Sequence, residues 1–199
     1  MNKITRRILL LLFVLATSVV KAQTREYYFI NSAPANGISI LRNDIKGFHF
    51  RNSVKSLKLD SVAINGYSGH QINATGIFLP TATGAPNIPT YCRSIAVPNG
   101  ATVRVEYHSL NSQTIQNVDL LPSPPILAET DTSLITYEKD SSIYYVNAYY
   151  PAQIVSVSDT FSFRGVNTVD ISFSPYQYNP VTKDHYLCGA GQSCTAKIK

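Results

Sequence analysis

The sequence is poor in cysteine, in clustered charge and in helical periodicity, and each shortage excludes a class of protein. Three cysteines leave at least one thiol unpaired, and they are too few for a disulfide-rich scaffold. No apolar residues recur convincingly at i, i+3, i+4 and i+7, so a helical fold is not expected. After the N-terminus, no second apolar stretch approaches the length that a bilayer requires.

The patterns of common catalytic and metal sites are also missing. The histidines lack the spacing of a metal site, and we interpret them as surface or capping residues: His49, His70, His108 and His185. Cys92 lies in an apolar run and is interpreted as a small buried thiol. Cys188 and Cys194 could close a small loop or bind a ligand. We therefore predict no catalytic residue, no metal site and no cofactor for this chain.

The first 22 residues have the features of a secretory signal peptide. Basic residues precede an apolar run from residue 8 to residue 20, and small residues, Val20 and Ala22, occupy the positions that a signal peptidase reads. A transmembrane anchor is the alternative, but this run is shorter than the roughly 20 residues of a membrane span. We expect residues 1–22 to be removed and residues 23–199 to form one exported domain, periplasmic, cell-surface or extracellular, without stable membrane insertion.

Removal of that segment also removes most of the net charge. The full chain has 17 lysines and arginines against 12 aspartates and glutamates, a net charge of +5. Four of the basic residues lie in the signal-like segment, which leaves 13 against 12, or +1. This small charge, without a basic cluster, excludes nucleic acid as the expected partner.

Short alternating runs rich in valine, isoleucine, tyrosine and phenylalanine predict an all-β fold. They cover residues 25–30, 37–41, 47–50, 56–64, 92–97, 101–110, 154–163 and 167–173. Proline, glycine and asparagine separate them, which favours an antiparallel β-sandwich or barrel. We predict a hairpin between residues 92–97 and 101–110, and a second hairpin that turns at Arg164 and Gly165. Val103, Val105 and Tyr107 are expected to face the core.

Several motifs, in order along the chain, are similar to the prodomain of gingipain-type cysteine peptidases. The series begins at Gly84-Ala85-Pro86-Asn87-Ile88-Pro89 and ends at Gln177-Tyr178-Asn179-Pro180-Val181-Thr182-Lys183. The positions that carry the resemblance are read as structural: Gly84, Pro86, Pro89, Pro151, Arg164, Gly165, Gln177, Tyr178, Asn179 and Pro180. We expect the corner from Tyr178 to Pro180 to lead into a further strand.

This resemblance implies a jelly-roll-like β-sandwich that assists the folding of a caspase-like cysteine peptidase domain and keeps it latent. In the family a loop enters the active-site cleft, and the corresponding segment here is Leu121–Asp131. Its candidate inhibitory residues are Pro122, Pro124, Pro125, Leu127, Ala128, Glu129 and Thr130. The three prolines would stiffen the loop and reduce the entropy cost of docking. Without the resemblance, a solvated proline-rich linker is the simpler interpretation.

Glu129 stands near the position where relatives that guard arginine-specific enzymes have a basic residue. The resemblance therefore implies a cognate peptidase that does not cut after arginine or lysine. A stand-alone exported β-sandwich that binds protein or glycan, with contact area from 13 tyrosines, is the alternative function.

Residues 184–199 depart from the family pattern, because their apolar positions are scattered between glycine and serine. From this tail we predict a sandwich without its last strand, with an exposed edge and low solubility. A truncated or frameshifted gene is one explanation and a fragmentary gene model is another. The catalytic histidine and cysteine of the family cannot be assigned to His185, Cys188 or Cys194.

Overall fold

The computed structural model describes residues 23–28, 37–44, 47–74, 82–108, 112–188 and 192–198. The strands are β1 (Thr24–Tyr28), β2 (Gly37–Asp44), β3 (Gly47–Ser53), β4 (Ser56–Ile64), β5 (Tyr67–Asn73), β6 (Tyr91–Ala96), β7 (Val103–His108), β8 (Ser112–Ile115), β9 (Val155–Val157), β10 (Phe161–Phe163), β11 (Val166–Phe173), β12 (Tyr176–Asn179), β13 (Asp184–Cys188) and β14 (Gln192–Ile198). One helical turn, α2 (Ser141–Tyr144), precedes β9. The strand ladders are antiparallel, which confirms the predicted fold class. Within the described ranges, no helix is long and apolar enough to cross a membrane.

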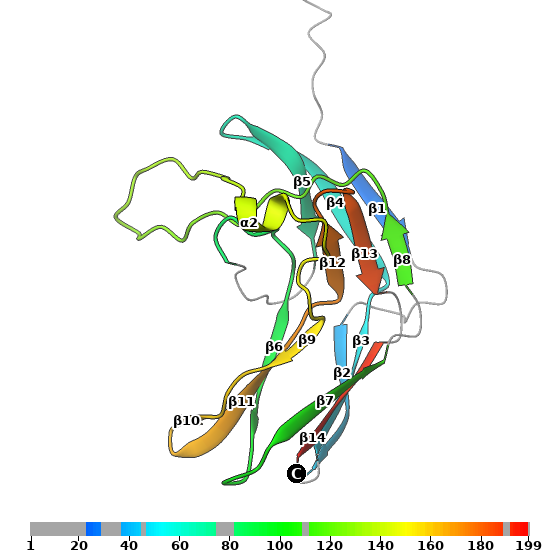
Figure 1. Ribbon diagram of the computed structural model, residues 1–199, viewed down its shortest axis with the longest axis vertical. Helices are drawn as coiled ribbons and strands as arrows, with labels where there is room; N and C mark the ends of the chain where they lie inside the picture. Colours follow the sequence, from blue (N-terminus) through cyan, green and yellow to red (C-terminus); the bar gives the residue numbers. More distant parts are fainter. Residues whose placement is uncertain are drawn as a thin grey trace, which may run out of the picture.

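The strands form two halves, each with its own core (Figure 1). In the upper half, the sheet β1–β4–β5 and the sheet β12–β13–β8 enclose the first core. In the lower half, the sheet β2–β3–β14–β7 faces the sheet β10–β11–β6. The main buried residues of the upper core are Leu57, Leu59, Ile72, Ile88, Ile115, Val118, Leu120, Tyr144, Tyr176 and Tyr178. Phe48, Phe50, Ile171 and Phe173 form the lower core.

The alternation of apolar residues explains which side of each strand is buried. Val103, Val105 and Tyr107 of β7 pack against the lower core, as predicted. Glu106 lies between them in the sequence and forms an ion pair with Lys197 of β14, with 2.7 Å between the charged atoms. The period of two therefore places one face of β7 in the core and leaves the other for polar contacts.

Two tight turns match their sequence signals. Asn65 and Gly66 join β4 to β5 with φ angles of 49° and 81°. Arg164 and Gly165 join β10 to β11 with φ angles of 51° and 80°, which confirms the predicted second hairpin. Glycine and asparagine tolerate positive φ, and such turns suit the twist of an antiparallel pair.

The first predicted hairpin is wrong. β6 pairs with β11, whereas β7 pairs with β14, so the chain passes from one sheet to the other at residues 98–100. The Asn-Gly sequence does form a turn, and Gly100 has a φ of 73°. A turn sequence fixes the local change of direction, but the sheet that each strand joins is decided by long-range pairing.

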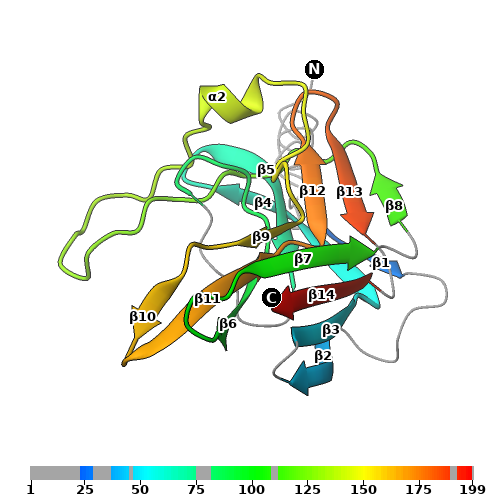
Figure 2. The same ribbon diagram turned by 60° about the horizontal axis from the view of Figure 1, so that its bottom comes forward.

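The predicted loss of the last strand is also wrong. The corner at Asn179 leads into β13, which lies between β12 and β8. β14 then lies between β3 and β7 in the lower half (Figure 2). Because neighbours on both sides supply backbone hydrogen bonds, a strand can form there despite its weak apolar pattern.

Several predictions lie outside the described residues. They are the signal-like segment, residues 29–30 and 109–110 at the ends of two predicted strands, and the side chains of His185, Cys188 and Cys194. Cys92, in contrast, is described: it lies in β6, is partly exposed and forms no disulfide. The prediction of a buried thiol at this position is therefore wrong, because Cys92 is only half-buried.

Candidate functional site: the segment between β8 and α2

The candidate inhibitory residues lie in a segment that projects from the upper half of the molecule between β8 and α2 (Figures 1 and 2). We call residues 123–139 the loop; they contain no regular helix or strand. Figure 1 shows its two arms leaving the body close to one another and joining at a distant tip. The residues before and after the loop determine where it points.

The chain that enters the loop is fixed to β5 at His70. The amide of His70 donates to the carbonyl oxygen of Asp119 at 2.6 Å, and the amide of Asp119 donates to Nδ1 of His70 at 3.0 Å. The amide of Leu121 then donates to the carbonyl oxygen of His70 at 2.9 Å. Gly69 allows this approach, because a β-carbon there would lie 2.8 Å from the carbonyl oxygen of Asp119.

Two tyrosine hydroxyls bind the same entering segment from the core side. The Tyr144 hydroxyl donates to the carbonyl oxygen of Leu120 at 2.9 Å, and the Tyr178 hydroxyl donates to that of Val118 at 3.1 Å. Burial is the main cause that raises the pKa of both phenols, that of Tyr178 to about 12. The neutral hydroxyls therefore remain donors, and these buried carbonyl groups stay satisfied.

The family-motif segment Gly84–Asn87 pairs with the first residues of the loop. The amide of Ser123 donates to the carbonyl oxygen of Ala85 at 2.8 Å, and the amide of Gly84 donates to the carbonyl oxygen of Ser123 at 2.9 Å. The amide of Asn87 donates to the carbonyl oxygen of Leu121 at 3.1 Å. This short ladder holds the entering arm in an extended conformation.

The residue that follows the loop, Asp140, binds the backbone of Gly84, which also binds the entering arm. The amide of Asp140 donates to the carbonyl oxygen of Gly84 at 2.9 Å. Gly84 has a φ of 81°, and a β-carbon there would lie 3.2 Å from the amide nitrogen of Asp140 and from the carbonyl oxygen of Glu138. Gly84 thus lies between the two arms at their root, where both its backbone angle and its small size are needed.

The leaving arm also contacts the turn between β4 and β5. The Asn65 side-chain amide donates to the carbonyl oxygen of Ile135 at 2.9 Å. The rings of Tyr67 and Tyr137 lie 5.9 Å apart at 57°. These contacts fix the half of the leaving arm that is nearer to the body.

Asp119 is an acidic residue at the root of the loop that forms ion pairs there. Its carboxylate binds Lys139 at 2.9 Å and Lys183 at 3.5 Å. Burial of the carboxylate opposes its ionisation, but the hydrogen bond from Lys139 and the two positive charges outweigh this and lower its pKa. The ion pair with Lys139 connects the entering segment to the last residue of the loop.

The tip of the loop is a turn at Glu129 and Thr130. The amide of Asp131 donates to the carbonyl oxygen of Ala128 at 2.9 Å, and its carboxylate accepts a hydrogen bond from the amide of Ser133 at 2.9 Å. The predicted inhibitory residues are spread along the arm that leads there. Pro122 is buried at the root, Pro124, Pro125 and Leu127 are partly buried, and Ala128, Glu129 and Thr130 are exposed.

The surface of the loop is apolar and acidic. Ile126 is 84% exposed on one arm and Leu134 is 80% exposed on the other, so both are available for contact. The acidic residues are Glu129, Asp131 and Glu138, and no lysine or arginine occurs between residues 122 and 138. The loop therefore offers a partner two exposed apolar side chains and several acidic groups, with no basic residue before Lys139.

The other family-motif residues support the structure around the loop. The backbones of Tyr150 and Tyr178 exchange two hydrogen bonds of 2.9 and 2.8 Å, and the Gln177 side-chain amide donates to the carbonyl oxygen of Pro151 at 2.8 Å. The Asn179 carboxamide accepts a hydrogen bond from the amide of Val181 at 3.0 Å. This last contact stabilises the predicted corner into β13.

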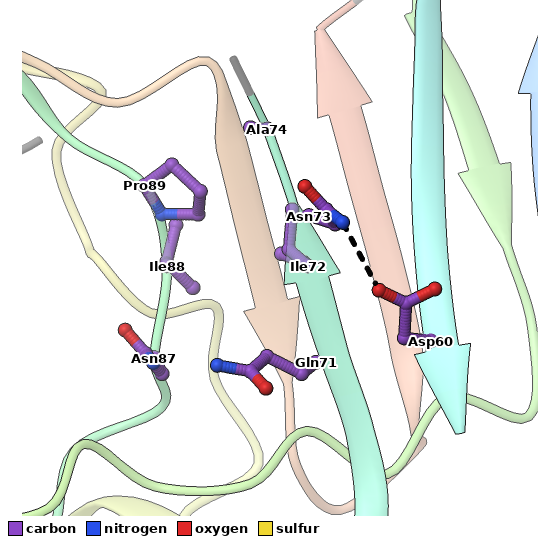
Figure 3. Close-up of a pocket in the computed structure, with 8 residues that line it drawn as sticks. All are labelled: Asp60, Gln71, Ile72, Asn73, Ala74, Asn87, Ile88 and Pro89. Carbon is purple, nitrogen blue, oxygen red and sulfur yellow. Dashed lines mark hydrogen bonds between the residues drawn. The ribbon is translucent and has the colours of Figure 1, made fainter. Parts of the chain in front are cut away.

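A separate polar pocket of about 310 Å³ lies beside β5 (Figure 3). In Figure 3, Ile88 and Pro89 lie on one side of it and Gln71 and Asn73 on the other. Its residues are Asp60, Gln71, Ile72, Asn73, Ala74, Asn87, Ile88 and Pro89. The carboxylate of Asp60 accepts hydrogen bonds from Asn73 at 3.2 Å and from Thr24 at 2.6 Å, so structural contacts already engage it. Among the described residues, the lining of this pocket contains no cysteine or histidine.

The predicted segment, Leu121–Asp131, covers the entering arm and the tip of the loop, but neither the leaving arm of residues 132–139 nor the residues that hold the root were predicted. His70 is neither a surface nor a capping residue: it is half-buried within β5 and accepts a hydrogen bond from Asp119, which is 49 positions away and carried no signal. The roles of Asn65 and Lys139 also depend on distant partners. Among the described residues, no group of three or more histidine, cysteine, aspartate or glutamate side chains could hold a metal ion.

Comparison with curated proteins identifies relatives over part of the chain. Gingipain R1 of Porphyromonas gingivalis is 36% identical over 101 residues, which cover 50% of this chain and 10% of the relative. Lys-gingipain HG66 of Porphyromonas gingivalis is 24% identical over 155 residues, which cover 75% of this chain and 9% of the relative. The chain therefore spans about a tenth of the length of these relatives.

Two solved structures share the fold. A chain described in work on the zymogenic latency of gingipain K from Porphyromonas gingivalis superposes with a TM-score of 0.71 at 21% identity, covering 89% of this chain and 99% of its own length. A chain from the complex of the Porphyromonas gingivalis RgpB pro- and mature domains superposes with a TM-score of 0.69 at 22% identity, covering 81% and 85% respectively. The model of the family Propeptide_C25 matches residues 38–189, and the chain therefore belongs to this family of gingipain-type peptidase propeptides.

Proposed function

We propose that this chain is a non-catalytic propeptide that assists the folding of a caspase-like cysteine peptidase domain and keeps it latent. The loop would enter the active-site cleft, with its tip at Glu129 closest to the catalytic residues. The observation that carries the proposal is an exposed tip on a root that is bound at both ends. Such a loop can bind with a small entropy cost, because much of its backbone is ordered before the partner arrives.

The charge of the tip indicates the specificity of the enzyme that it blocks. A cleft that prefers arginine or lysine presents negative charge to its substrate, and Glu129 and Asp131 would be repelled there. We infer a cognate peptidase that does not cut after basic residues. Ile126 and Leu134 would occupy apolar subsites on either side of the tip.

Replacement of the acidic residue at the tip by a basic one tests this function. The chain from residue 23 to residue 199 and its Glu129→Arg variant would be titrated against an arginine-specific gingipain catalytic domain, with inhibition constants as the readout. Glu138→Arg is the matched control, because it makes the same charge change at an exposed position near the root of the loop. We expect inhibition only by Glu129→Arg.

Each alternative result has a distinct meaning. Nanomolar inhibition by the unchanged chain would contradict the inferred specificity. Equal inhibition by the two arginine variants would show a general charge effect, and no inhibition by either would contradict entry of the loop into the cleft. A chain that binds no peptidase but retains a protein or glycan would support the alternative of a stand-alone binding module.

We also infer that the chain is exported. The basic start and the apolar run of residues 8–20 support removal of residues 1–22 by a signal peptidase. The N-terminal residue of the secreted protein, determined by mass spectrometry after expression with its own leader, tests this. A mature chain that begins at Gln23 is expected, and retention of Met1 in a membrane fraction would contradict it.

A further inference from the structure

We propose that Gly84 and Asp119 are positioning residues that hold both arms of the loop in a fixed geometry before any partner binds. This inference rests on the proposed function, because the loop is taken as the inhibitory element. It goes further, because it assigns the fixed conformation of the loop to two residues outside the loop. Gly84 would act through its backbone, and Asp119 through its charge.

Gly84 binds both arms of the loop at once. Its amide donates to Ser123 on the entering arm, and its carbonyl oxygen accepts from Asp140 just after the leaving arm. One peptide segment therefore sets the distance between the two ends of the loop. A side chain at this position would push directly against the leaving arm, where its β-carbon would meet backbone atoms at 3.2 Å.

Asp119 connects the same two ends of the loop through a different set of atoms. Its backbone is bound to His70 of β5, so its position does not depend on the loop. Its carboxylate reaches Lys139, the last residue of the loop, at 2.9 Å. Lys139 also lies 5.0 Å above the ring of the buried Tyr144, which limits the directions that its side chain can take.

Among the described residues, the hydrogen bonds that hold the two arms to the body end before the tip. Asn65 binds the leaving arm at Ile135, and the first residues of the entering arm are bound at Leu121 and Ser123. Glu129 and Thr130 are exposed, and they lie in the turn that the amide of Asp131 closes by donating to the carbonyl oxygen of Ala128. The conformation of the tip therefore depends on the hydrogen bonds at the root. Loss of those bonds should weaken binding of the loop to the peptidase, without any change to the residues that touch the partner.

A pair of glycine variants separates this role from ordinary backbone strain. Gly165 has a φ of 80°, nearly the same as Gly84, but a β-carbon there would have no neighbour within 4 Å. Gly84→Ala and Gly165→Ala thus carry a similar conformational cost, and only Gly84→Ala disturbs the loop. Gly84→Asn is a third variant, because asparagine tolerates positive φ while its β-carbon still meets the leaving arm.

The readout is amide hydrogen exchange by NMR in the chain from residue 23 to residue 199. In Gly84→Ala and Gly84→Asn we expect the amides of Ser123 and Asp140 to exchange about tenfold faster or more, with little change in the exchange of β11. In Gly165→Ala these two amides should exchange as in the unchanged chain. Similar exchange at Ser123 and Asp140 in all variants would overturn the proposal.

A charge variant tests the second positioning residue. Asp119→Asn should accelerate exchange at Asp140, whereas Glu106→Gln, which removes an ion pair with Lys197 on the opposite half, should not. If both variants changed Asp140 equally, the role of Asp119 would be a general charge effect and this part of the proposal would be wrong.

Inhibition then distinguishes the inference from the proposed function. In the Glu129→Arg background, Gly84→Ala should raise the inhibition constant against the arginine-specific catalytic domain, and Gly165→Ala should leave it unchanged. Unchanged inhibition by Gly84→Ala, despite faster exchange, would show that order at the root does not position the tip. If no chain inhibits but exchange responds as expected, the proposed function fails and the ordering of the loop by Gly84 stands.

Discussion

His70 and Asp119, 49 positions apart in the sequence, bind each other through two hydrogen bonds. The amide of Asp119 donates to Nδ1 of the imidazole, so this nitrogen carries no proton and the ring is the Nε2–H tautomer. A histidine in a chain without catalytic motifs is here a structural acceptor. It orients the residue whose carboxylate holds the leaving arm of the loop.

Replacement of His70 should destabilise the protein. His70→Ala removes the acceptor and leaves the partly buried amide of Asp119 unpaired, which costs about 1–2 kcal/mol of unfolding free energy. Urea denaturation followed by tyrosine fluorescence measures this loss. His108→Ala, at an exposed strand end, is the control and should change stability by less than about 0.5 kcal/mol. Equal losses in the two variants would contradict the structural role of His70.

Removal of the Tyr178 hydroxyl should also destabilise the protein. Tyr178→Phe keeps the buried ring but leaves the carbonyl oxygen of Val118 without its donor, which we expect to cost about 1–2 kcal/mol. Tyr145→Phe is the control, because Tyr145 is 84% exposed. Thermal unfolding should show a lower Tm for Tyr178→Phe alone.

The same tyrosine predicts instability at alkaline pH. Its pKa is raised by burial from 10.0 to about 12, so the unfolded chain releases this proton at a lower pH than the folded chain. The stability that the neutral Tyr178 hydroxyl contributes to the folded chain is therefore fully present below pH 10. It is lost as the pH rises through about 12. Denaturation between pH 8 and pH 12 should show a smaller pH dependence for Tyr178→Phe than for the unchanged chain. An identical dependence would contradict the assignment.

The lowered pKa of Asp119 predicts a loss of stability at acidic pH. Its pKa lies below the ordinary 3.8, so the folded chain keeps the carboxylate ionised at pH values where the unfolded chain takes up a proton. The stability that the ion pairs contribute is present above pH 3.8 and is lost as the pH falls through the lowered value. Asp119→Asn should be less stable than the unchanged chain at pH 7, and this difference should shrink toward pH 3. The carboxylate is one-third exposed, so salt should reduce the effect. Asp159→Asn, at an exposed position, is the control and should match the unchanged chain at both pH values.

The position of β14 predicts that the tail is required for folding. A chain that stops at Cys188 loses the strand between β3 and β7, which exposes two strand edges and part of the lower core around Phe48 and Phe50. We expect the chain from residue 23 to residue 199 to unfold cooperatively and the shortened chain to aggregate. Calorimetry and size-exclusion chromatography measure the two properties. A shortened chain with an unchanged melting transition would show that β14 contributes nothing.

Local sequence determined much of this protein. Apolar alternation predicted the β-sandwich and the buried face of β7, and Arg164-Gly165 predicted a turn, because these signals depend only on neighbouring residues. The ordered motifs predicted the propeptide family. The proline-rich stretch also marked the arm that leads to the tip.

Tertiary structure alone decided how these elements combine. The separation of β6 from β7, and the insertion of β14 between β3 and β7, depend on hydrogen bonds between strands far apart in the sequence. No local sequence pattern predicts the contact of Gly84 with both arms of the loop. Backbone groups carry no residue identity, so the residues that they bind are selected by the packing of the whole chain.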